Sequence, residues 1–387
     1  MSAPRSFELL INPRHGVPGV TILPGGGFRR AKAAITTWPG YAATPLRDLP
    51  VIAAEAGIGT LRLKDESSRF GLGSFKALGG AYAVANLLAA EVSRAGLARS
   101  ANSEDLATGR FAAHTGGITV SCATDGNHGR SVAWGAGRFH CRCVIFVHET
   151  VSQARVDAIT RFGAAVVRVA GNYDDAVREA DRQAATNGWF IVSDTSYPGY
   201  TEVPRDVMQG YRLMADEAAD QWAGAPPTHV FMQAGVGGAA AAVSVQMRAR
   251  FAPAPLLVVV EPERAACLLQ SARTGTASVV HGDLATIMAG LACGEPSLLA
   301  WQELERAAWA FMSIPDVAAA RSLRRLADGG IVIGESGVAG MAGLLASVSD
   351  AAAKKDLRLT TDSRVLLFGT EGITDPATYH NTLSLTV

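Results

Sequence analysis

The sequence predicts an α/β protein in two lobes, in which mostly parallel strands are covered by helices. Short runs rich in Val, Ile and Leu alternate with Ala-rich segments of helical periodicity, and Gly-rich turns separate them. The chain has 387 residues, of which 48% are hydrophobic, so it contains enough apolar material for more than one core. A largely disordered chain is therefore excluded.

The order of these elements supports a parallel sheet. Continuous apolar runs are typical of strands that are buried on both faces, and the helices between them supply the crossovers. The predicted strands are 118–123, 144–147, 165–169, 189–192, 230–232, 256–260 and 365–368. The predicted helices are 129–137, 153–162, 174–185 and 239–250. We expect residues 85–195 to form a smaller lobe inserted into a larger lobe made of residues 1–84 and 196–387.

The composition excludes several classes of protein. Thirty-five basic side chains balance thirty-five acidic ones, so no overall field recruits nucleic acid or an anionic membrane. The longest apolar stretch, 230–247, is interrupted by glutamines, glycines and a serine, and residues 1–20 do not resemble a secretory signal. Five cysteines without paired CxxC spacing predict neither a metal site nor a disulfide framework. We expect a soluble, cytoplasmic protein with free thiols.

The first segment with functional potential runs from Leu63 to Lys76. A strand ends in charged residues, a Gly-containing turn follows, and Lys76 opens an Ala- and Gly-rich helix. One interpretation is an ordinary solvated lysine at a helix start. The alternative is an amine beside a pocket that condenses with a carbonyl cofactor, because burial and a helix N-terminus both disfavour the ammonium form and keep a lysine nucleophilic.

The second segment, Ser121 to Arg130, follows a strand and leads into a helix. Its glycines let the backbone approach a ligand, Asn127 can hydrogen-bond a cofactor oxygen, and Asp125 can exchange a proton. A plain capping turn is the competing interpretation, since Asp, Asn and Gly are all common there.

The third segment, Gln233 to Ala240, again joins a strand to a helix. Its backbone N–H groups at a helix N-terminus are suited to binding a phosphate. The spacing Gly235-x-Gly237-x-x-Ala240, with Glu261 closing the next strand, also satisfies the dinucleotide-binding pattern, and a tight strand–helix turn would explain the glycines as well.

Polar residues follow several other predicted strands. In open α/β sheets, ligands collect at the carboxyl ends of the strands, although any one such residue can simply cap a helix. The residues in question are Asp194, Thr195, Glu261, Glu335, Ser336, Thr370 and Glu371.

Together, the three segments resemble the fold-type II pyridoxal-phosphate enzymes, the group that contains threonine dehydratase and the tryptophan synthase β-chain. The resemblance implies two open, twisted α/β lobes with the cofactor in the cleft between them. It also implies that a lysine after Ser-Phe binds the cofactor and that a Gly-rich loop holds its phosphate. The cofactor-binding residues that it implies are Phe75, Lys76, Asn127, Gly235, Val236, Gly237, Gly238, Ala239, Glu335 and Thr370.

Within that group, the chain most resembles the diaminopropionate ammonia-lyases. The long run from Thr286 to Pro296 is the most specific match, and recognisable matches extend from about Trp38 to Asp375. Residues 73–76, Gly-Ser-Phe-Lys, are closer to the dehydratase pattern, whereas residues 369–372, Gly-Thr-Glu-Gly, are closer to the lyases. Asp125 is the main discriminator, because dehydratases usually carry a small or hydroxylated residue there.

The resemblance implies a reaction and a set of residues for it. The reaction is α,β-elimination of ammonia from D- or L-2,3-diaminopropionate, giving pyruvate and two molecules of ammonia. Lys76 and Asp125 would remove the α-proton from opposite faces, and Asp194 would bind the β-ammonium group or assist its departure. The substrate-binding residues would be Ser74, Thr124, Asp125, Gly126, His128 and Asp194.

The same resemblance leaves other expectations and two alternatives. A homodimer is expected, with a small amino acid as substrate, pyridoxal 5'-phosphate as cofactor and no metal ligand. The first alternative is a serine or threonine dehydratase, which expels hydroxide and does not depend on Asp125 or Asp194. The second is a pyridoxal-phosphate-binding protein that turns over no amino acid.

Overall fold

The computed structural model describes residues 7–171 and 173–385, which form two compact α/β units. Unit 1 contains the chain up to Ile22, Ala43–Ser68, and the chain from Met214 onward. Unit 2 contains Leu23–Ala42 and Arg69–Leu213. The predicted α/β class with two sheets is confirmed.

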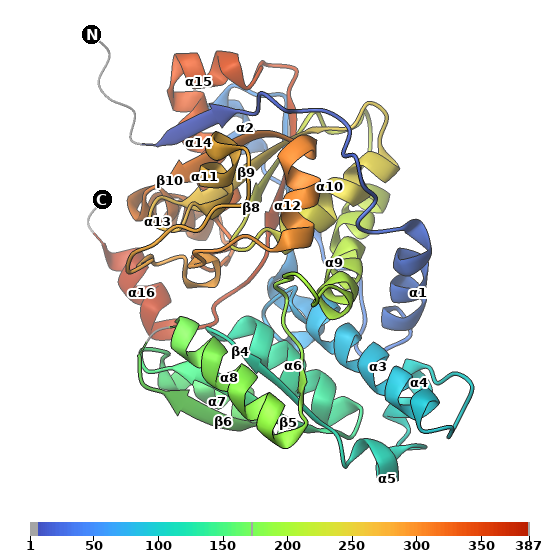
Figure 1. The fold of residues 1–387 in the computed structure, drawn as a ribbon. Helices are drawn as coiled ribbons and strands as arrows, with labels where there is room; N and C mark the ends of the chain where they lie inside the picture. Colours follow the sequence, from blue (N-terminus) through green and yellow to red (C-terminus); the bar gives the residue numbers. More distant parts are fainter. Residues whose placement is uncertain (1–6, 172, 386–387) are drawn as a thin grey trace. The chain divides into compact units, whose positions relative to one another are not determined.

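Unit 1 is built on a seven-stranded sheet (Figure 1). From edge to edge its strands are β1 (Glu8–Ile11), β10 (Ala308–Ile314), β9 (Leu256–Pro262), β8 (His229–Gln233), β11 (Arg364–Gly369), β3 (Thr60–Asp65) and β2 (Leu46–Asp48). The five inner strands are parallel, and the two edge strands β1 and β2 run antiparallel to their neighbours. The parallel arrangement follows from the continuous apolar runs of the inner strands, which are buried on both faces.

Helices cover the sheet of unit 1. Alternate strand residues such as Val258 and Val260 share one core with α13 and α14, and Gly343 of α14 lies so close to Val260 that an added Cβ would be 2.8 Å from it. The helices of this unit are α2 (Pro50–Ala56), α10 (Gly238–Arg250), α11 (Cys267–Thr274), α12 (Leu298–Ala307), α13 (Asp316–Asp328), α14 (Ala339–Ser349), α15 (Ala351–Asp356) and α16 (Pro376–Ser384), with a short 3-10 turn η2 (Ala289–Leu291).

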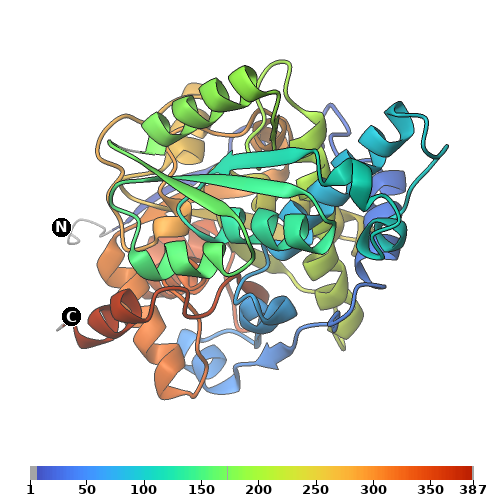
Figure 2. The ribbon, with the colours of Figure 1, turned by 90° about the horizontal axis from the view of Figure 1, so that it is seen from below.

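Unit 2 is built on a four-stranded parallel sheet (Figure 2). Its strands, in spatial order, are β6 (Ala165–Val169), β5 (Arg142–His148), β4 (Thr119–Ala123) and β7 (Phe190–Ile191). Helix α8 covers one face, and α6 and α7 cover the other. The helices of this unit are α1 (Gly25–Ile35), α3 (Ala77–Arg94), α4 (Ser103–Ala107), α5 (Ala112–Thr115), α6 (Asn127–Arg138), α7 (Gln153–Thr160) and α8 (Tyr173–Asn187).

Two elements lie across the boundary between the units. They are the 3-10 segment η1 (Glu66–Gly71) and the long helix α9 (Glu202–Gln221). The larger segment of unit 2, Arg69–Leu213, extends beyond the expected 85–195 segment at both ends. The packing of α3 on α6 gives a reason: a Cβ on Gly80 would meet the Ser131 hydroxyl at 2.0 Å, and one on Gly135 would meet Cα of Ala81 at 2.8 Å.

The parallel strands fix where functional side chains can lie. In unit 2, Ala123 pairs with Phe146, so the residues after β4 and after β5 emerge at the same sheet edge. In unit 1, the turn after β8 and the residues after β11 likewise emerge at one edge, since Phe231 pairs with Leu367. Within the residues described, no helix is both long and apolar enough to cross a membrane.

Candidate active site

Lys76 is not an ordinary solvated lysine. It directly precedes α3, its side chain is 21% exposed, and its Nζ lies 2.5 Å from Oδ2 of Asp194. The same ammonium group lies 5.4 Å from the ring centre of Phe75 and 5.5 Å from that of Tyr211. A primary amine is therefore held between a carboxylate and two aromatic rings, where its position is well defined.

Asp194 follows the short strand β7 and faces Lys76 and His128. Burial raises the pKa of its carboxyl, but the nearby Lys76 ammonium outweighs burial, so the pKa lies below its usual range. Nδ1 of His128 lies 3.7 Å from Oδ2 of Asp194. The carboxylate therefore stays ionised and ready to bind an ammonium group.

The protonation of His128 follows from its hydrogen bond. Nε2 lies 2.8 Å from the carbonyl of Val192, which can only accept, so Nε2 carries the hydrogen. Burial lowers the pKa of this imidazole, which leaves Nδ1 unprotonated. Nδ1 is buried without a hydrogen-bond partner among the described residues. His128 thus offers a buried lone pair beside the Lys76–Asp194 pair.

In the turn from β4 to α6, one residue caps the helix and its neighbour is left for another role. The hydroxyl of Thr124 accepts hydrogen bonds from the backbone N–H groups of Gly126 and Gly129, at 3.0 and 3.1 Å. Thr124, rather than Asp125, therefore fills the role that the capping interpretation required. The Asp125 carboxylate instead lies 2.8 Å from Nε2 of His148.

Asn127 begins α6, two residues earlier than the predicted helix start. Its Oδ1 accepts a hydrogen bond of 2.7 Å from Arg130. In this way the Arg130 guanidinium, one turn along the helix, fixes the amide plane of the residue expected to hydrogen-bond a cofactor oxygen. Ser74 is buried, and its hydroxyl accepts a bond of 3.3 Å from the backbone N–H of Lys76.

The Gly-rich turn of unit 1, residues 235–239, fits a phosphate group. Gly237 is the N-cap of α10 with φ +94°, and no side chain caps the helix, so its first N–H groups are available to an anion. Gly235 leaves no room for a side chain, because an added Cβ would lie 2.9 Å from Sγ of Cys293. Ser297 fixes the turn by donating its N–H to the Val236 carbonyl at 2.9 Å.

Thr370 follows β11 and is buried. Its Oγ1 accepts a hydrogen bond of 2.7 Å from Nε2 of Gln233, the last residue of β8. Since the oxygen is already an acceptor, the hydroxyl hydrogen of Thr370 is oriented for donation elsewhere. This donor would fit an unprotonated pyridine nitrogen.

The segment around Glu335 and the end of β11 are joined by main-chain contacts. Glu335 is buried, and the N–H of the next residue, Ser336, donates to the Glu371 carboxylate at 3.0 Å. The N–H of Gly334 donates to the Glu371 carbonyl at 2.8 Å. Glu371 therefore positions this loop. The Ser336 hydroxyl accepts a hydrogen bond of 3.0 Å from the distant N–H of Gly290, whereas Thr195 makes a local contact, its N–H donating to the Ser193 hydroxyl at 3.1 Å.

The acidic residue that the dinucleotide interpretation requires, Glu261, has a structural role. Glu261 is fully buried, and its two carboxylate oxygens accept hydrogen bonds from the N–H groups of Leu268 and Leu269, at 2.8 and 2.7 Å. It caps α11 and is not free to bind a ribose hydroxyl. Glu261 is therefore a structural residue, and the glycine pattern alone does not indicate a nucleotide.

The predicted residues thus fall into two sets. Unit 2 carries Ser74, Phe75, Lys76, Thr124, Asp125, Gly126, Asn127, His128 and Asp194, and unit 1 carries Gly235, Val236, Gly237, Gly238, Ala239, Glu335 and Thr370. Sequence reasoning missed Tyr211, His148 and Gln233. The position of Gln233 directly before the glycines was a usable signal. Among the described residues, no group of three or more His, Cys, Asp or Glu side chains is arranged to hold a metal ion.

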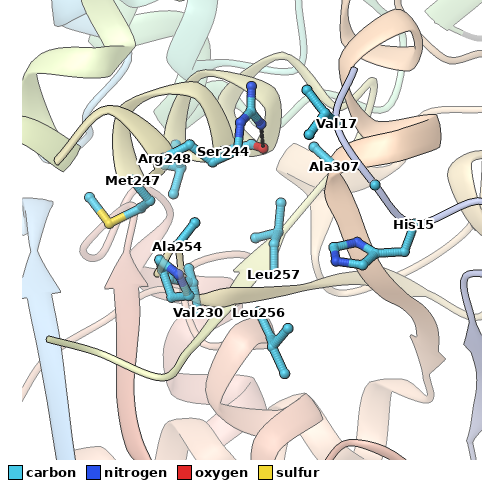
Figure 3. A pocket seen from close by; sticks show the side chains of 13 residues that line it. His15, Val17, Val230, Ser244, Met247, Arg248, Ala254, Leu256, Leu257 and Ala307 are labelled. Carbon is cyan, nitrogen blue, oxygen red and sulfur yellow. Dashed lines mark hydrogen bonds between the residues drawn. The ribbon is translucent and has the colours of Figure 1, made fainter. Parts of the chain in front are cut away.

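A pocket of about 240 Å³ in unit 1 lies apart from these residues (Figure 3). Val230, Leu256 and Leu257 line it at the amino ends of β8 and β9, and Arg248 of α10 and His15 border it. None of the predicted site residues line it. The glycine turn and Thr370 follow the carboxyl ends of their strands, so this pocket is a separate feature.

Comparisons with known proteins agree with one another. The family model for pyridoxal-phosphate dependent enzymes matches residues 37–369. Diaminopropionate ammonia-lyase of Escherichia coli strain K12 is 41% identical over 356 residues, which are 88% of this chain and 87% of that protein. The crystal structure of the holo diaminopropionate ammonia lyase from Escherichia coli superimposes with a TM-score of 0.90 at 36% identity, covering 98% of this chain and 96% of that one.

A more distant relative represents the dehydratase alternative. A probable D-serine dehydratase of Ectopseudomonas mendocina is 28% identical over 316 residues, which are 76% of this chain and 67% of that protein. Its identity to this chain is clearly lower than that of the ammonia-lyase.

Proposed function

The chain belongs to the pyridoxal-phosphate-dependent enzymes and, among them, to the diaminopropionate ammonia-lyase family, and from this premise we propose that it eliminates ammonia from 2,3-diaminopropionate. With one water, the reaction gives pyruvate and two molecules of ammonia. The observation that carries the proposal is the pair formed by Lys76 and Asp194, in which an amine and an ionised carboxylate are held 2.5 Å apart. Pyridoxal phosphate, when bound, supplies the electron sink.

We assign the proton transfers to two groups of unit 2. Lys76 would supply the amine that holds the cofactor, and its Nζ, once free, would remove the α-proton from one face and return a proton to the leaving amine. Asp125 removes the α-proton of the other enantiomer from the opposite face. This role is supported by the turn, in which the Thr124 hydroxyl binds the N–H groups of Gly126 and Gly129, so the Asp125 carboxylate is not needed as a cap.

We assign the binding of the substrate ammonium to Asp194. Because the pKa of this carboxyl is held below its usual range, the group is ionised at neutral pH and attracts a cation. Ser74, Thr124, Gly126 and His128 complete the proposed substrate-binding set.

We assign cofactor binding to a set of backbone and side-chain groups. The N–H groups of residues 235–239 at the start of α10 would bind the phosphate, and the Thr370 hydroxyl would donate to the pyridine nitrogen. A neutral hydroxyl partner leaves that nitrogen unprotonated. Asn127 would contact the hydroxyl group of the cofactor ring. Phe75, Val236 and Glu335 would line the rest of the cofactor-binding site.

We further propose a homodimer in the cytoplasm. The five free cysteines are consistent with a reducing compartment, and the family resemblance supports the dimer. Light scattering on the purified protein at several concentrations tests the oligomeric state, and a mass of about 40 kDa would contradict the dimer.

The decisive experiment measures product formation from separate substrates. Purified, cofactor-loaded protein is given D- and L-2,3-diaminopropionate, L-serine and L-threonine, and the oxo-acids and ammonia are quantified. We expect fast pyruvate formation from diaminopropionate with two ammonia per pyruvate, and little from the hydroxy amino acids. A preference for serine or threonine would instead establish a dehydratase, and Asp125 would then be a residue of the turn only.

A further inference from the structure

The register of the four-stranded sheet of unit 2 places a histidine beside Asp125. Ala123 at the end of β4 pairs with Phe146 of β5, and Thr124 donates its N–H to the Phe146 carbonyl at 3.0 Å. Asp125 and His148 each lie two residues beyond this pair, so their side chains meet at the same sheet edge. Nε2 of His148 lies 2.8 Å from Oδ1 of Asp125, and the two side chains are 18% and 22% exposed.

The partners of the two ring nitrogens indicate where the hydrogen of His148 lies. The Asp125 carboxylate can only accept, so Nε2 carries the hydrogen and donates it. The hydroxyl of Thr150 lies 2.9 Å from Nδ1, which in a neutral ring accepts the hydrogen of that hydroxyl. Thr150, His148 and Asp125 therefore form a chain of hydrogen bonds that ends on Oδ1.

The backbone that carries Thr150 is held in shape from the neighbouring strand. The guanidinium group of Arg168 on β6 donates to the carbonyls of Glu149 and Val151, at 2.8 and 2.7 Å. A second guanidinium, that of Arg155 on α7, donates to the backbone carbonyl of Asp125 at 3.1 Å. Both arginines donate to backbone carbonyl oxygens and not to the Asp125 carboxylate. Within the described residues, the carboxylate receives its hydrogen bond from His148.

We propose that His148 is a positioning residue for Asp125, an inference that rests on the proposed elimination reaction. By binding Oδ1 it fixes the plane of the carboxylate and leaves Oδ2 for the α-proton of one diaminopropionate enantiomer. In that step the C–Hα bond would break, the proton would go to Oδ2, and the electron pair would stay on the substrate carbon, for which pyridoxal phosphate, when bound, would supply the electron sink. The other enantiomer, which is served by Lys76, does not depend on His148.

The test compares two substitutions on the two enantiomers. His148→Phe removes both hydrogen bonds and keeps a ring, whereas His148→Gln keeps an N–H donor that can reach the carboxylate. A general base accelerates a reaction by roughly 10²–10⁴-fold. We therefore expect His148→Phe, which disturbs the base without removing it, to lower kcat by about tenfold or more for one enantiomer. KM for that enantiomer, and kcat for the other enantiomer, should change little. His148→Gln should restore most of that loss. The matched control is His140→Phe in the same unit, where an exposed histidine is replaced and both rates should persist.

A spectroscopic measurement checks the same bond without turnover. In holoenzyme with ¹⁵N-labelled histidine, the His148 signal, identified by its loss in His148→Gln, should report hydrogen on Nε2 and none on Nδ1, and Asp125→Asn should shift it. An equal fall in kcat for both enantiomers, no fall at all, or a hydrogen on Nδ1 would overturn the proposal. Absence of pyruvate from either enantiomer with the unsubstituted enzyme would refute the proposed function instead, and the labelled spectrum would still decide whether His148 binds Asp125.

Discussion

Nζ of Lys76 lies 2.5 Å from Oδ2 of Asp194, and both side chains are largely withdrawn from solvent. The two residues are 118 positions apart in the chain, and α3 and the end of β7 bring them together. The Asp194 carboxylate, whose pKa lies below its usual range, fixes the position of the Lys76 ammonium and stabilises its charge. Lys76 must therefore lose a proton before its amine can act as a nucleophile or as a base.

Asp194→Asn should therefore impair turnover of both enantiomers. The amide keeps the size of the side chain but cannot hold an ammonium group with a full charge, so we expect kcat/KM for D- and L-diaminopropionate to fall by about 100-fold or more. Since the pKa of Asp194 lies below its usual range, this group should contribute no inflection to the pH–rate profile between pH 6 and pH 9. Initial rates of pyruvate release measure both effects. Asp157→Asn, at an exposed position of the same unit, is the control, and wild-type rates in Asp194→Asn would refute the assignment.

Much of the strand order could be anticipated because buried parallel strands leave continuous apolar runs. The predicted strand 165–169 coincides with β6, and the inner strands β8, β9 and β11 were found to within one or two residues. The edge strands β1 and β2 were not predicted, since they are short and partly exposed and so carry no continuous apolar run. Strand β10, Ala-Trp-Ala-Phe-Met-Ser-Ile, was missed because it directly follows helix α12 and contains Ala and Met, which favour helices.

The site was predicted only as far as local motifs extend. Lys76, Asp125 and the glycines each stand in a recognisable turn, and the structure places each of these turns between a strand and a helix. Their partners are not local: His148 meets Asp125 through the register of β4 and β5, and Gln233 meets Thr370 across neighbouring strands. Such contacts depend on how strands pair, which a sequence pattern around one residue does not contain.

Gly235→Ala should weaken cofactor binding. The added Cβ would lie 2.9 Å from Sγ of Cys293 and 3.3 Å from Cα of Leu291, so the turn must move away from the position that presents its N–H groups. We expect the Kd for pyridoxal phosphate to rise by about tenfold, or roughly 1.4 kcal/mol. Absorbance titration of the cofactor-free protein measures this change. Gly19→Ala, where an added Cβ meets nothing within 4 Å, is the control, and equal affinities of the two variants would contradict the phosphate assignment.

Glu261 should make stability fall as the pH rises. Burial raises the pKa of this carboxyl from 4.5 to about 8, although the N–H groups of Leu268 and Leu269 oppose the shift. Between these two values the folded state binds more protons than the unfolded state, so the stability contributed by the neutral acid is complete below pH 4.5 and is lost toward pH 8. The slope is at most about 1.4 kcal/mol per pH unit.

Melting temperatures measured from pH 5.5 to pH 8.5 test this slope. Glu261→Gln cannot ionise, so its melting temperature should depend less on pH than that of the unsubstituted protein, even though the loss of one acceptor lowers its overall value. Glu263→Gln, at an exposed position two residues later, should retain the original slope. Parallel curves for all three proteins would show that Glu261 does not titrate differently on folding.

Removing Lys64 alone should cost more stability than removing Lys64 and Glu217 together. Its Nζ lies 2.7 Å from Oε2 of Glu217 and 2.6 Å from the Thr44 carbonyl, and the two charged side chains are 0% and 5% exposed. Lys64→Met leaves the Glu217 carboxylate in the interior without its cation, which costs about 3–5 kcal/mol. In the double variant Lys64→Met/Glu217→Leu no charge of the pair remains buried, so we expect it to be more stable than Lys64→Met alone. Urea unfolding followed by fluorescence gives the coupling energy of the pair, and additive losses would mean that the two residues do not stabilise each other.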